Sequence, residues 1–338
     1  MSAQLGWALA VVVLAGILNG SFAAPMKRIS AWPWENSWSL FALFGLVMIP
    51  WLTTLATVPH LGEVYAGATP STLWKVVVFG ALWGTGATLF GLGISRVGMA
   101  LGFSLILGMT ASFGSLFPMI ILHPEQLLAR RGLALIAGTI VMIAGLVLLS
   151  LAGLARERDR GEASSRNSGF KLGLVICIFS GIFSSLLNFS FVFGDELRVR
   201  ALAAGASAGV AANPIWALTV SAGSLANLLY CGYLLSKNRT WGAYGKGNVA
   251  LNWLLGISMG ALWFSGTALY GTGAAIMGSL GNIVGWPIFM TVDILVALFW
   301  GAVSGEWKGA RRRALAYCWI GVCVLLAAIA VISYGNAA

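Results

Sequence analysis

Residues 81–98 of the chain read ALWGTGATLFGLGISRVG, and residues 261–278 read ALWFSGTALYGTGAAIMG, so the chain carries one stretch twice. At a constant separation of 180 positions the identical residues coincide without a gap: Ala81/Ala261, Leu82/Leu262, Trp83/Trp263, Gly86/Gly266, Leu89/Leu269, Gly91/Gly271, Gly93/Gly273 and Gly98/Gly278. Chance similarity between two apolar segments gives scattered Leu and Ala, not a Trp and four Gly in register. The stretch therefore indicates an internal duplication.

The composition is that of a membrane protein. Of the 338 residues, 59% are hydrophobic and 9% are charged, whereas soluble domains have about 25% charged residues. The net charge of +10 is also typical of nucleic-acid-binding proteins. Here, however, the basic residues lie in short connectors between apolar runs, where the preference of cytoplasmic loops for Lys and Arg explains them. We therefore expect a polytopic protein whose surroundings are a lipid bilayer, with no nucleic-acid partner.

Ten apolar runs have the length that a spanning helix needs, which is about 20 residues. They cover residues 6–24, 38–57, 74–95, 99–121, 132–154, 170–192, 214–235, 251–270, 279–302 and 314–334. The small-residue-rich stretch from Leu197 to Asn213 is open to interpretation as an amphipathic or re-entrant segment. The most polar connector is typical of a flexible linker. It divides the chain into a first half (1–155), a cytoplasmic linker (156–169) and a second half (170–338).

The basic residues predict the orientation of these spans. Connectors after odd-numbered spans hold fifteen of them: Lys27, Arg28, Arg96, Arg156, Arg158, Arg160, Arg166, Lys171, Lys237, Arg239, Lys246, Lys308, Arg311, Arg312 and Arg313. Connectors after even-numbered spans hold five: Lys75, Arg130, Arg131, Arg198 and Arg200. Because cytoplasmic loops are enriched in Lys and Arg, we expect the odd connectors in the cytoplasm and both termini in the periplasm.

The first span of each half supports the duplication. LNGSF at residues 18–22 recurs as LNFSF at residues 187–191, 169 positions later. Since each half holds an odd number of spans, the second half must lie inverted in the bilayer. We therefore predict an all-α polytopic membrane protein of ten transmembrane helices, built as two inverted five-helix repeats. Such repeats are typical of transporters that bind their substrate near the midplane, between the halves.

Several motifs resemble one transporter family. PMKR at residues 25–28, followed by WPWENSWS at 32–39, is similar to the first cytoplasmic loop of the bacterial L-rhamnose–proton symporter family. FGALWG at 79–84, RVGMALG at 96–102, and EW at 306–307 followed by two Arg match that family as well. The resemblance runs over most of the chain and is strongest in residues 25–40 and 79–120. It implies the fold of the drug/metabolite transporter superfamily, in which the third and fourth helices of each half line the cavity.

Asp293 is the main candidate for a proton-coupling residue. It lies in the middle of the ninth span, where a carboxylate costs at least about 2.5 kcal/mol by insertion scales and normally faces a cavity. Low dielectric raises the pKa of a carboxyl group, which suits a group that loads and releases a proton. The alternative is a neutral Asp that is hydrogen-bonded to a Ser or Thr of a neighbouring helix. The resemblance gives no carboxylate at this position, so it leaves open which sugar is carried.

Glu35 is a second candidate, flanked by three Trp just inside the predicted cytoplasmic interface. Trp is enriched at membrane interfaces, so the simpler interpretation is an anchoring belt with a solvated carboxylate. The functional alternative is a gate carboxylate that pairs with Lys27 or Arg28.

Sugars bind through hydrogen bonds to their hydroxyls and aromatic contact with their apolar ring faces. The candidate cavity residues that supply such groups are Asn19, Trp83, Ser104, Thr110, Ser112, Asn188, Trp263 and Tyr270. For each Trp the alternative is packing against lipid or a helix, and for each Asn it is a hydrogen bond between the halves. The glycines of the repeated stretch favour close helix packing.

No motif supports catalysis. A Walker pattern for ATP is absent, His60 and His123 have no metal-ligand companion, and no cofactor or metal is expected. The resemblance implies a secondary active transporter for proton-coupled uptake of a sugar such as L-rhamnose across the bacterial inner membrane. One alternative is an exporter or exchanger of another small metabolite on the same fold. The other, a membrane-embedded enzyme or signalling subunit, would require catalytic residues that the sequence lacks. The sequence does not indicate an oligomeric state.

Overall fold

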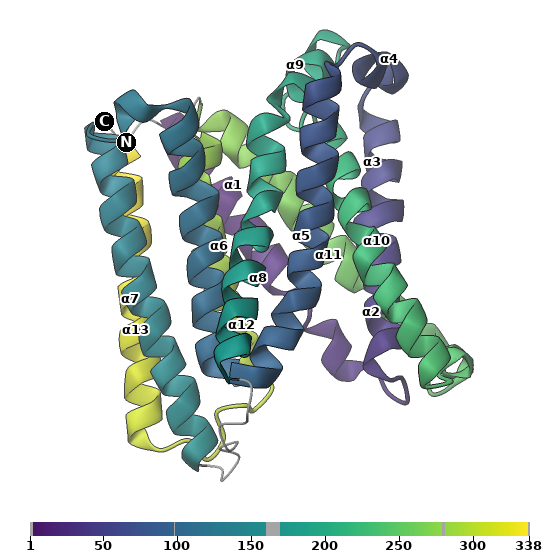
Figure 1. Ribbon diagram of the computed structural model, residues 1–338, viewed down its shortest axis with the longest axis vertical. Coiled ribbons are helices and arrows are strands. Elements are labelled where there is room, and N and C mark those ends of the chain that lie inside the picture. The colour runs from purple at the N-terminus through teal and green to yellow at the C-terminus, as the bar shows by residue number, and fades with distance from the viewer. Residues whose placement is uncertain (1–2, 98, 160–169, 279–280, 337–338) are drawn as a thin grey trace.

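The computed structural model describes residues 3–97, 99–159, 170–278 and 281–336, and these contain helices and no strands (Figure 1). The longer helices are α1 (Ala3–Gly20), α2 (Trp34–Leu43), α3 (Ile49–Thr57), α5 (Pro70–Val97), α6 (Met99–Leu122), α7 (Arg130–Asp159), α8 (Phe170–Phe193), α10 (Asn213–Lys237), α11 (Val249–Ile276), α12 (Gly281–Val303) and α13 (Arg312–Asn336). The remaining helical segments are η1 (Pro25–Arg28), η2 (Phe44–Met48), α4 (Leu61–Ala66), η3 (Pro124–Gln126), α9 (Asp195–Ala203) and η4 (Trp241–Gly245).

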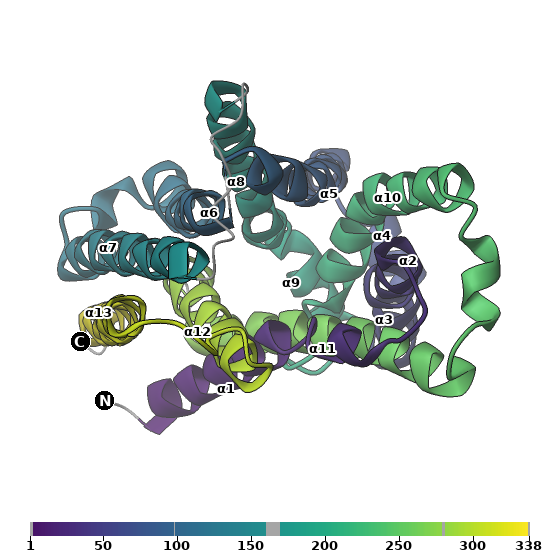
Figure 2. The same ribbon diagram turned by 90° about the horizontal axis from the view of Figure 1, so that it is seen from below.

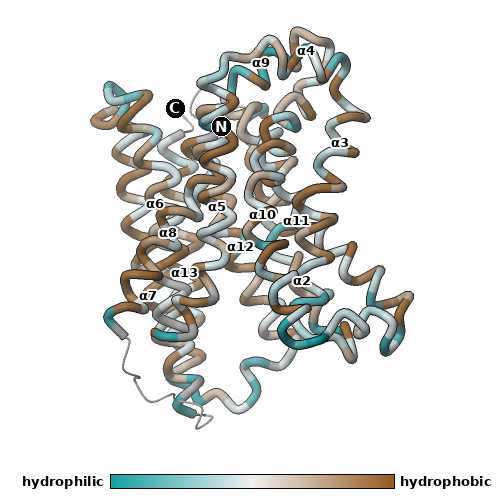
Figure 3. The backbone as a smooth tube through the Cα atoms, turned by 45° about the vertical axis from the view of Figure 1, so that its right-hand side comes forward, coloured by the Kyte–Doolittle hydropathy of each residue, from teal (hydrophilic) through white to brown (hydrophobic). Residues whose placement is uncertain are grey.

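Ten helical segments of the described chain are long and apolar enough to cross a membrane, which confirms the predicted all-α fold with ten spans. Hydrophobic residues dominate the middle of the bundle, and hydrophilic ones gather at its two ends (Figure 3). The chain is therefore a multi-pass membrane protein. Both ends of the described chain lie at the same end as α4 and α9, and η1 and η4 lie at the other end (Figure 1).

The predicted span 38–57 is built from three pieces, because Pro50 has no N–H to donate to the carbonyl four residues earlier. The chain forms the π-helical segment η2 just before Pro50, between α2 and α3. The hydroxyl of Ser221 on α10 donates to the Leu46 carbonyl oxygen at 3.3 Å. A neighbouring helix thus satisfies a backbone group that the proline leaves free, as helices in lipid require.

The stretch from Leu197 to Asn213 begins within α9, on which Leu197 and Ala201 are buried, and continues through turns into α10. The carboxylate of Glu196 accepts hydrogen bonds from the Thr69 backbone N–H at 3.0 Å and from the Thr72 hydroxyl at 2.6 Å. These two bonds tie α9 to the beginning of α5.

The helices of the two halves pack reciprocally. The first helix of the first half, α1, packs on α11 and α12, while the first helix of the second half, α8, packs on α5 and α6. The fifth helices of the two halves, α7 and α13, pack on each other at one edge of the bundle (Figure 2). Each half thus completes the core of the other.

The repeated glycines make corresponding contacts in the two halves. A Cβ atom at Gly86 would lie 2.9 Å from the backbone nitrogen of Ser184, and one at Gly266 would lie 2.7 Å from the carbonyl oxygen of Ala15. Gly86 and Gly266 are 180 positions apart, and Ala15 and Ser184 are 169 apart, which are the two separations seen in the sequence. A second set of contacts has the same two separations: Gly93 lies close to Cys177, and Gly273 lies close to Ala8. These glycines permit close helix crossings that bulkier residues would prevent.

The second span of each half also crosses the third span of the other half at paired glycines. A Cβ atom at Gly45 would lie 2.7 Å from the Gly260 Cα, and one at Gly223 would lie 2.8 Å from the Gly80 carbonyl oxygen. Because Gly80 and Gly260 correspond at a separation of 180, Gly45 corresponds to Gly223 at a separation of 178. The reciprocal contacts therefore extend the internal correspondence to α2 and α10.

Candidate substrate cavity

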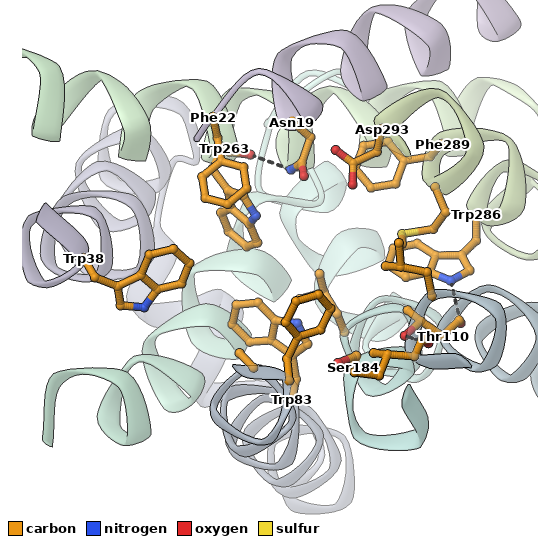
Figure 4. A pocket seen from close by; sticks show the side chains of 16 residues that line it. Asn19, Phe22, Trp38, Trp83, Thr110, Ser184, Trp263, Trp286, Phe289 and Asp293 are labelled. Atoms are coloured by element: carbon orange, nitrogen blue, oxygen red, sulfur yellow. Dashed lines mark hydrogen bonds between the residues drawn. The ribbon is translucent and has the colours of Figure 1, made fainter. Parts of the chain in front are cut away.

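A cavity of about 220 Å³ lies between the two halves. Its wall includes residues of the third and fourth helices of both halves (α5, α6, α11 and α12), of the first helices α1 and α8, and of α2. Most of the wall is aromatic or aliphatic, and its polar side chains include Asn19, Thr110, Ser184 and Asp293 (Figure 4). An apolar wall with a few polar groups is the usual composition of a small-molecule site.

The two tryptophans of the repeated stretch meet in this wall. The rings of Trp83 and Trp263 stack with centroids 5.4 Å apart and an interplanar angle of 27° (Figure 4). Gly223 makes room for Trp83, because a Cβ there would lie 2.5 Å from that ring. Among the described residues neither indole N–H makes a hydrogen bond, so both donors remain available to a bound molecule. The predicted cavity pair is thus contributed by corresponding positions of the two halves.

Asp293 lies in the middle of α12 and lines the cavity (Figure 4). Its carboxylate lies against the end of α1, where a Cβ at Gly20 would be 3.1 Å from Asp293 Oδ1. Within the part of the chain that the structure describes, the carboxylate has no ion pair and no hydrogen bond. The bond to a neighbouring Ser or Thr that the alternative interpretation requires is therefore not observed. Among the described residues, no other one that lines the cavity is acidic or basic.

Asn19, at the end of α1, lines the cavity beside Asp293 (Figure 4). Its Nδ2 donates to the Trp263 carbonyl oxygen at 3.1 Å and to Thr267 Oγ1 at 3.3 Å. The side chain thus both connects the two halves and contributes to the wall, which combines the two interpretations that the sequence left open.

Asn188 and Tyr270, also predicted for the cavity, lie outside its lining. Asn188 Nδ2 donates to the Gly114 carbonyl oxygen at 2.7 Å, and the Tyr270 hydroxyl donates to Asn188 Oδ1 at 2.7 Å. Pro118 has no N–H with which to bond Gly114, four residues before it. Asn188 therefore supplies the donor that the helix lacks, which is a structural task.

The three hydroxyl candidates on α6 have different positions. Thr110 lines the cavity, but its hydroxyl donates to the Ile106 carbonyl oxygen at 2.8 Å. Ser112 does not line it, and its buried hydroxyl has no hydrogen-bond partner among the described residues. The side chain of Ser104 lies outside the part that the structure describes.

Glu35 lies away from the cavity, at the beginning of α2, and is 5% exposed. Its Oε1 accepts hydrogen bonds from Asn238 Nδ2 at 3.0 Å and from the Thr240 hydroxyl at 2.9 Å. Lys27, its proposed partner, instead pairs with Glu306 at 2.6 Å. Glu35 therefore connects α2 with the connector after α10 and forms no ion pair with any residue that the structure describes.

Sequence reasoning missed several residues of the wall, among them Phe22, Trp38, Ser184 and Trp286. Trp286 had a usable signal, since it precedes Asp293 by seven positions and so shares its helix face. Its indole donates to the Thr110 carbonyl oxygen at 3.1 Å.

Three buried aromatic side chains, Phe191, Trp216 and Tyr270, form what we call the packed group. Phe191 lies 4.7 Å from Trp216 and 5.6 Å from Tyr270 between ring centroids, and Trp216 lies 6.1 Å from Tyr270. Tyr270 also stacks on Phe289, whose ring lines the cavity, at 4.9 Å. All three lie near the helix ends that face α4 and α9. The packed group therefore separates the cavity from that end of the molecule.

Their counterparts in the first half, at separations of 169, 178 and 180, are Phe22, Trp38 and Phe90, which we call the lining group. All three line the cavity and are only partly buried. They lie toward the end that carries the connectors after odd-numbered spans.

Two comparisons with known proteins bear on this cavity. The family described as L-rhamnose-proton symport protein (RhaT) matches residues 3–338. Similar curated proteins include L-rhamnose-proton symporters of Yersinia pestis (strain Pestoides F) and Yersinia pseudotuberculosis serotype O:3 (strain YPIII), each 27% identical over 324 residues, which are 94% of both chains. The symporter of Escherichia coli O1:K1 / APEC is 27% identical over 323 residues, again 94% of both chains.

Proposed function

The chain belongs to the family of L-rhamnose–proton symport proteins, and from this membership we propose that it takes up a sugar such as L-rhamnose together with a proton, across the inner membrane of a bacterium. The observation that carries the proposal is the cavity between the two halves. Its wall combines stacked aromatic rings, which suit the apolar faces of a sugar, with an unpaired carboxylate, which suits a proton.

Asp293 is the proton-binding residue of this proposal. A carboxylate inside the bilayer without a cationic partner is strongly destabilised when ionised, so it binds a proton readily. Within the described part of the chain, no second acidic or basic side chain lines the cavity. Proton and sugar thus bind within one space, which is what coupling of their movements requires.

The sugar-binding residues of the proposal are Asn19, Trp83, Ser184 and Trp263. Since the two rings stack on each other, each offers its indole N–H group and the part of its ring that the partner leaves uncovered. Asn19 and Ser184 add polar atoms (Figure 4). Asn188 and Tyr270 support this wall from outside it. Glu35 has a role outside the cavity: it holds the connector after α10 against the beginning of α2.

Movement across the membrane proceeds by alternating access, in which the site is exposed first to one side and then to the other. The packed group closes the cavity toward the end with both termini, which the bias of Lys and Arg assigns to the periplasm. The reciprocal packing of two corresponding halves supports a movement in which the packed and lining groups exchange roles.

The proposal is tested by adding L-rhamnose to de-energised cells that produce the protein, while the external pH is recorded. We expect the external pH to rise, because protons enter with the sugar. Other deoxysugars are added in parallel, and a rise with one of them alone would keep symport and change the substrate. The absence of a rise with any sugar, despite confirmed membrane insertion, would contradict symport and favour export or exchange of another metabolite.

A further inference from the structure

The amide of Asn19 has a fixed orientation. Its Nδ2 lies 3.1 Å from the Trp263 carbonyl oxygen, which only accepts hydrogen bonds. Thr267 Oγ1 donates its own hydrogen to that same carbonyl at 3.0 Å, so toward Asn19 it acts as an acceptor. Both neighbours therefore require the nitrogen end of the amide. The oxygen end, Oδ1, faces the cavity (Figure 4).

Asn19 Oδ1 and the Asp293 carboxylate lie on the same part of the wall, where α1 ends against α12 (Figure 4). Neither receives a hydrogen bond from the residues that the structure describes, although Asn19 is only 7% exposed. Both acceptors face the cavity, where a molecule that brings hydrogen-bond donors, such as water or a sugar hydroxyl, can satisfy them.

We propose that Asn19 couples the two substrates: its amide oxygen and the Asp293 carboxyl grip one hydroxyl of the sugar, and this grip is complete only when Asp293 carries the proton. This inference rests on the proposed function. It adds a residue that enforces coupling and a chemical reason why the sugar binds together with the proton.

The reason lies in the single hydrogen of a hydroxyl group. When Asp293 is ionised, the hydroxyl faces two acceptors and can donate to one of them, so the other stays unsatisfied. When Asp293 is protonated, the carboxyl O–H donates to the hydroxyl oxygen, and the hydroxyl donates to Asn19 Oδ1. Every group then has a partner. A buried acceptor that is left without a donor weakens binding, so the sugar affinity depends on the proton.

Other titratable groups do not take over this role. α1 and α6 carry none, and α11 carries Tyr270, whose hydroxyl donates to Asn188. Lys171 and Cys177 on α8, and the titratable residues of α7 and α13, do not line the cavity. The Asn19 counterpart, Asn188, has both ends of its amide engaged, by Gly114 and Tyr270. The position that corresponds to Asn19 in the second half therefore does not repeat the arrangement.

The test replaces Asn19 with a residue that can donate as well as accept. In Asn19→Ser the new hydroxyl can donate to the sugar oxygen while the sugar donates to ionised Asp293, so binding no longer needs the proton. The apparent affinity for L-rhamnose is measured by counterflow in vesicles between about pH 5.5 and 8.5. For the unmodified protein we expect a loss of about tenfold per pH unit at the alkaline end, the slope for one linked proton.

In Asn19→Ser we expect a change of less than about threefold over the same range, and fewer protons moved per sugar. The control Asn188→Ser lowers the amount of folded protein but retains the slope. Asn19→Thr repeats the test if Asn19→Ser does not reach the membrane. A slope in both Asn19 variants equal to that of the unmodified protein would overturn the proposal. If the unmodified protein binds no sugar at all, the proposed function fails instead.

Discussion

The packed group and the lining group occupy corresponding positions of a duplicated chain and have opposite surroundings. Phe191, Trp216 and Tyr270 are buried against one another and lie outside the cavity lining. Phe22, Trp38 and Phe90 are partly buried and line the cavity, although the rings of Phe22 and Trp38 also contact each other, with centroids 6.2 Å apart. Because both groups consist of aromatic residues, residue type does not explain why one is buried and the other lines the cavity. The packing of the surrounding helices does. It teaches that corresponding positions of the two halves can be packed in one half and face the cavity in the other within a single conformation.

Asp293 has no acidic counterpart, and this gives the largest effect we expect from one substitution. The position 180 residues earlier is Phe113, so among the described residues only the second half places a carboxylate in the cavity. Asp293→Asn should abolish uphill accumulation of sugar while sparing counterflow, because the amide cannot carry the proton. The measurement compares both kinds of uptake in the same vesicles. Asp195→Asn, at the end of the molecule, is the matched control. Undiminished uphill uptake in Asp293→Asn would remove this residue from the mechanism.

Trp216 of the packed group and Trp38 of the lining group should respond differently to replacement by Ala. Trp216 is fully buried, so Trp216→Ala should lower the free energy of unfolding by about 3–5 kcal/mol. Trp38 is partly buried and lines the cavity, so Trp38→Ala should destabilise less and mainly weaken sugar binding. Thermal unfolding in detergent and the KM for uptake give the two readouts. Equal destabilisation by both substitutions would mean that the groups do not differ in packing.

Asn188, unlike its counterpart Asn19, has a structural task, and a substitution of Pro118 tests it. Asn188→Ala leaves the Gly114 carbonyl without a donor and should lower the free energy of unfolding by about 1–3 kcal/mol. Pro118→Ala restores an N–H four residues after Gly114, so Asn188→Ala should be less destabilising in that background. A double-mutant cycle measures the coupling, which we expect at about 0.5–3 kcal/mol. Additive effects would show that Asn188 does not act on the carbonyl that the proline leaves free.

The smallest differences concern the repeated glycines. Gly86→Ala and Gly266→Ala place a Cβ into corresponding close contacts and should each destabilise by about 1–3 kcal/mol, by similar amounts. Gly232→Ala, on α10, meets nothing within 4 Å and serves as the control. It should stabilise the helix by about 0.5–1 kcal/mol. A large difference between Gly86→Ala and Gly266→Ala, measured as a shift in Tm, would argue against corresponding crossings.

The helices were largely predictable, because an apolar run of spanning length has few alternatives in lipid. Their ends were less so. α11 continues to Ile276, beyond the expected residue 270. Its last turns still pack on α1, because Gly273 lies close to Val12. α2 begins at Trp34 rather than residue 38, where Glu35 in its first turn receives two hydrogen bonds from a distant connector.

The cavity was predictable where the duplication or a buried charge marked it, as for Trp83, Trp263 and Asp293. Asn188 shows the limit of this reasoning. Its sequence context is like that of Asn19, but a proline on another helix creates a carbonyl that engages it. Such a contact depends on packing between distant segments, which local patterns do not contain.

The central claim is that the packed and lining groups exchange roles during transport. Single-cysteine variants Phe22→Cys and Phe191→Cys, in a background without the four native cysteines, are treated with a thiol reagent on each side of the membrane. In the resting state we expect modification at position 22 from the cytoplasmic side and protection at position 191. External L-rhamnose at acidic pH should expose position 191 to the periplasmic side and protect position 22. Protection of position 191 under every condition, together with active transport, would contradict the account.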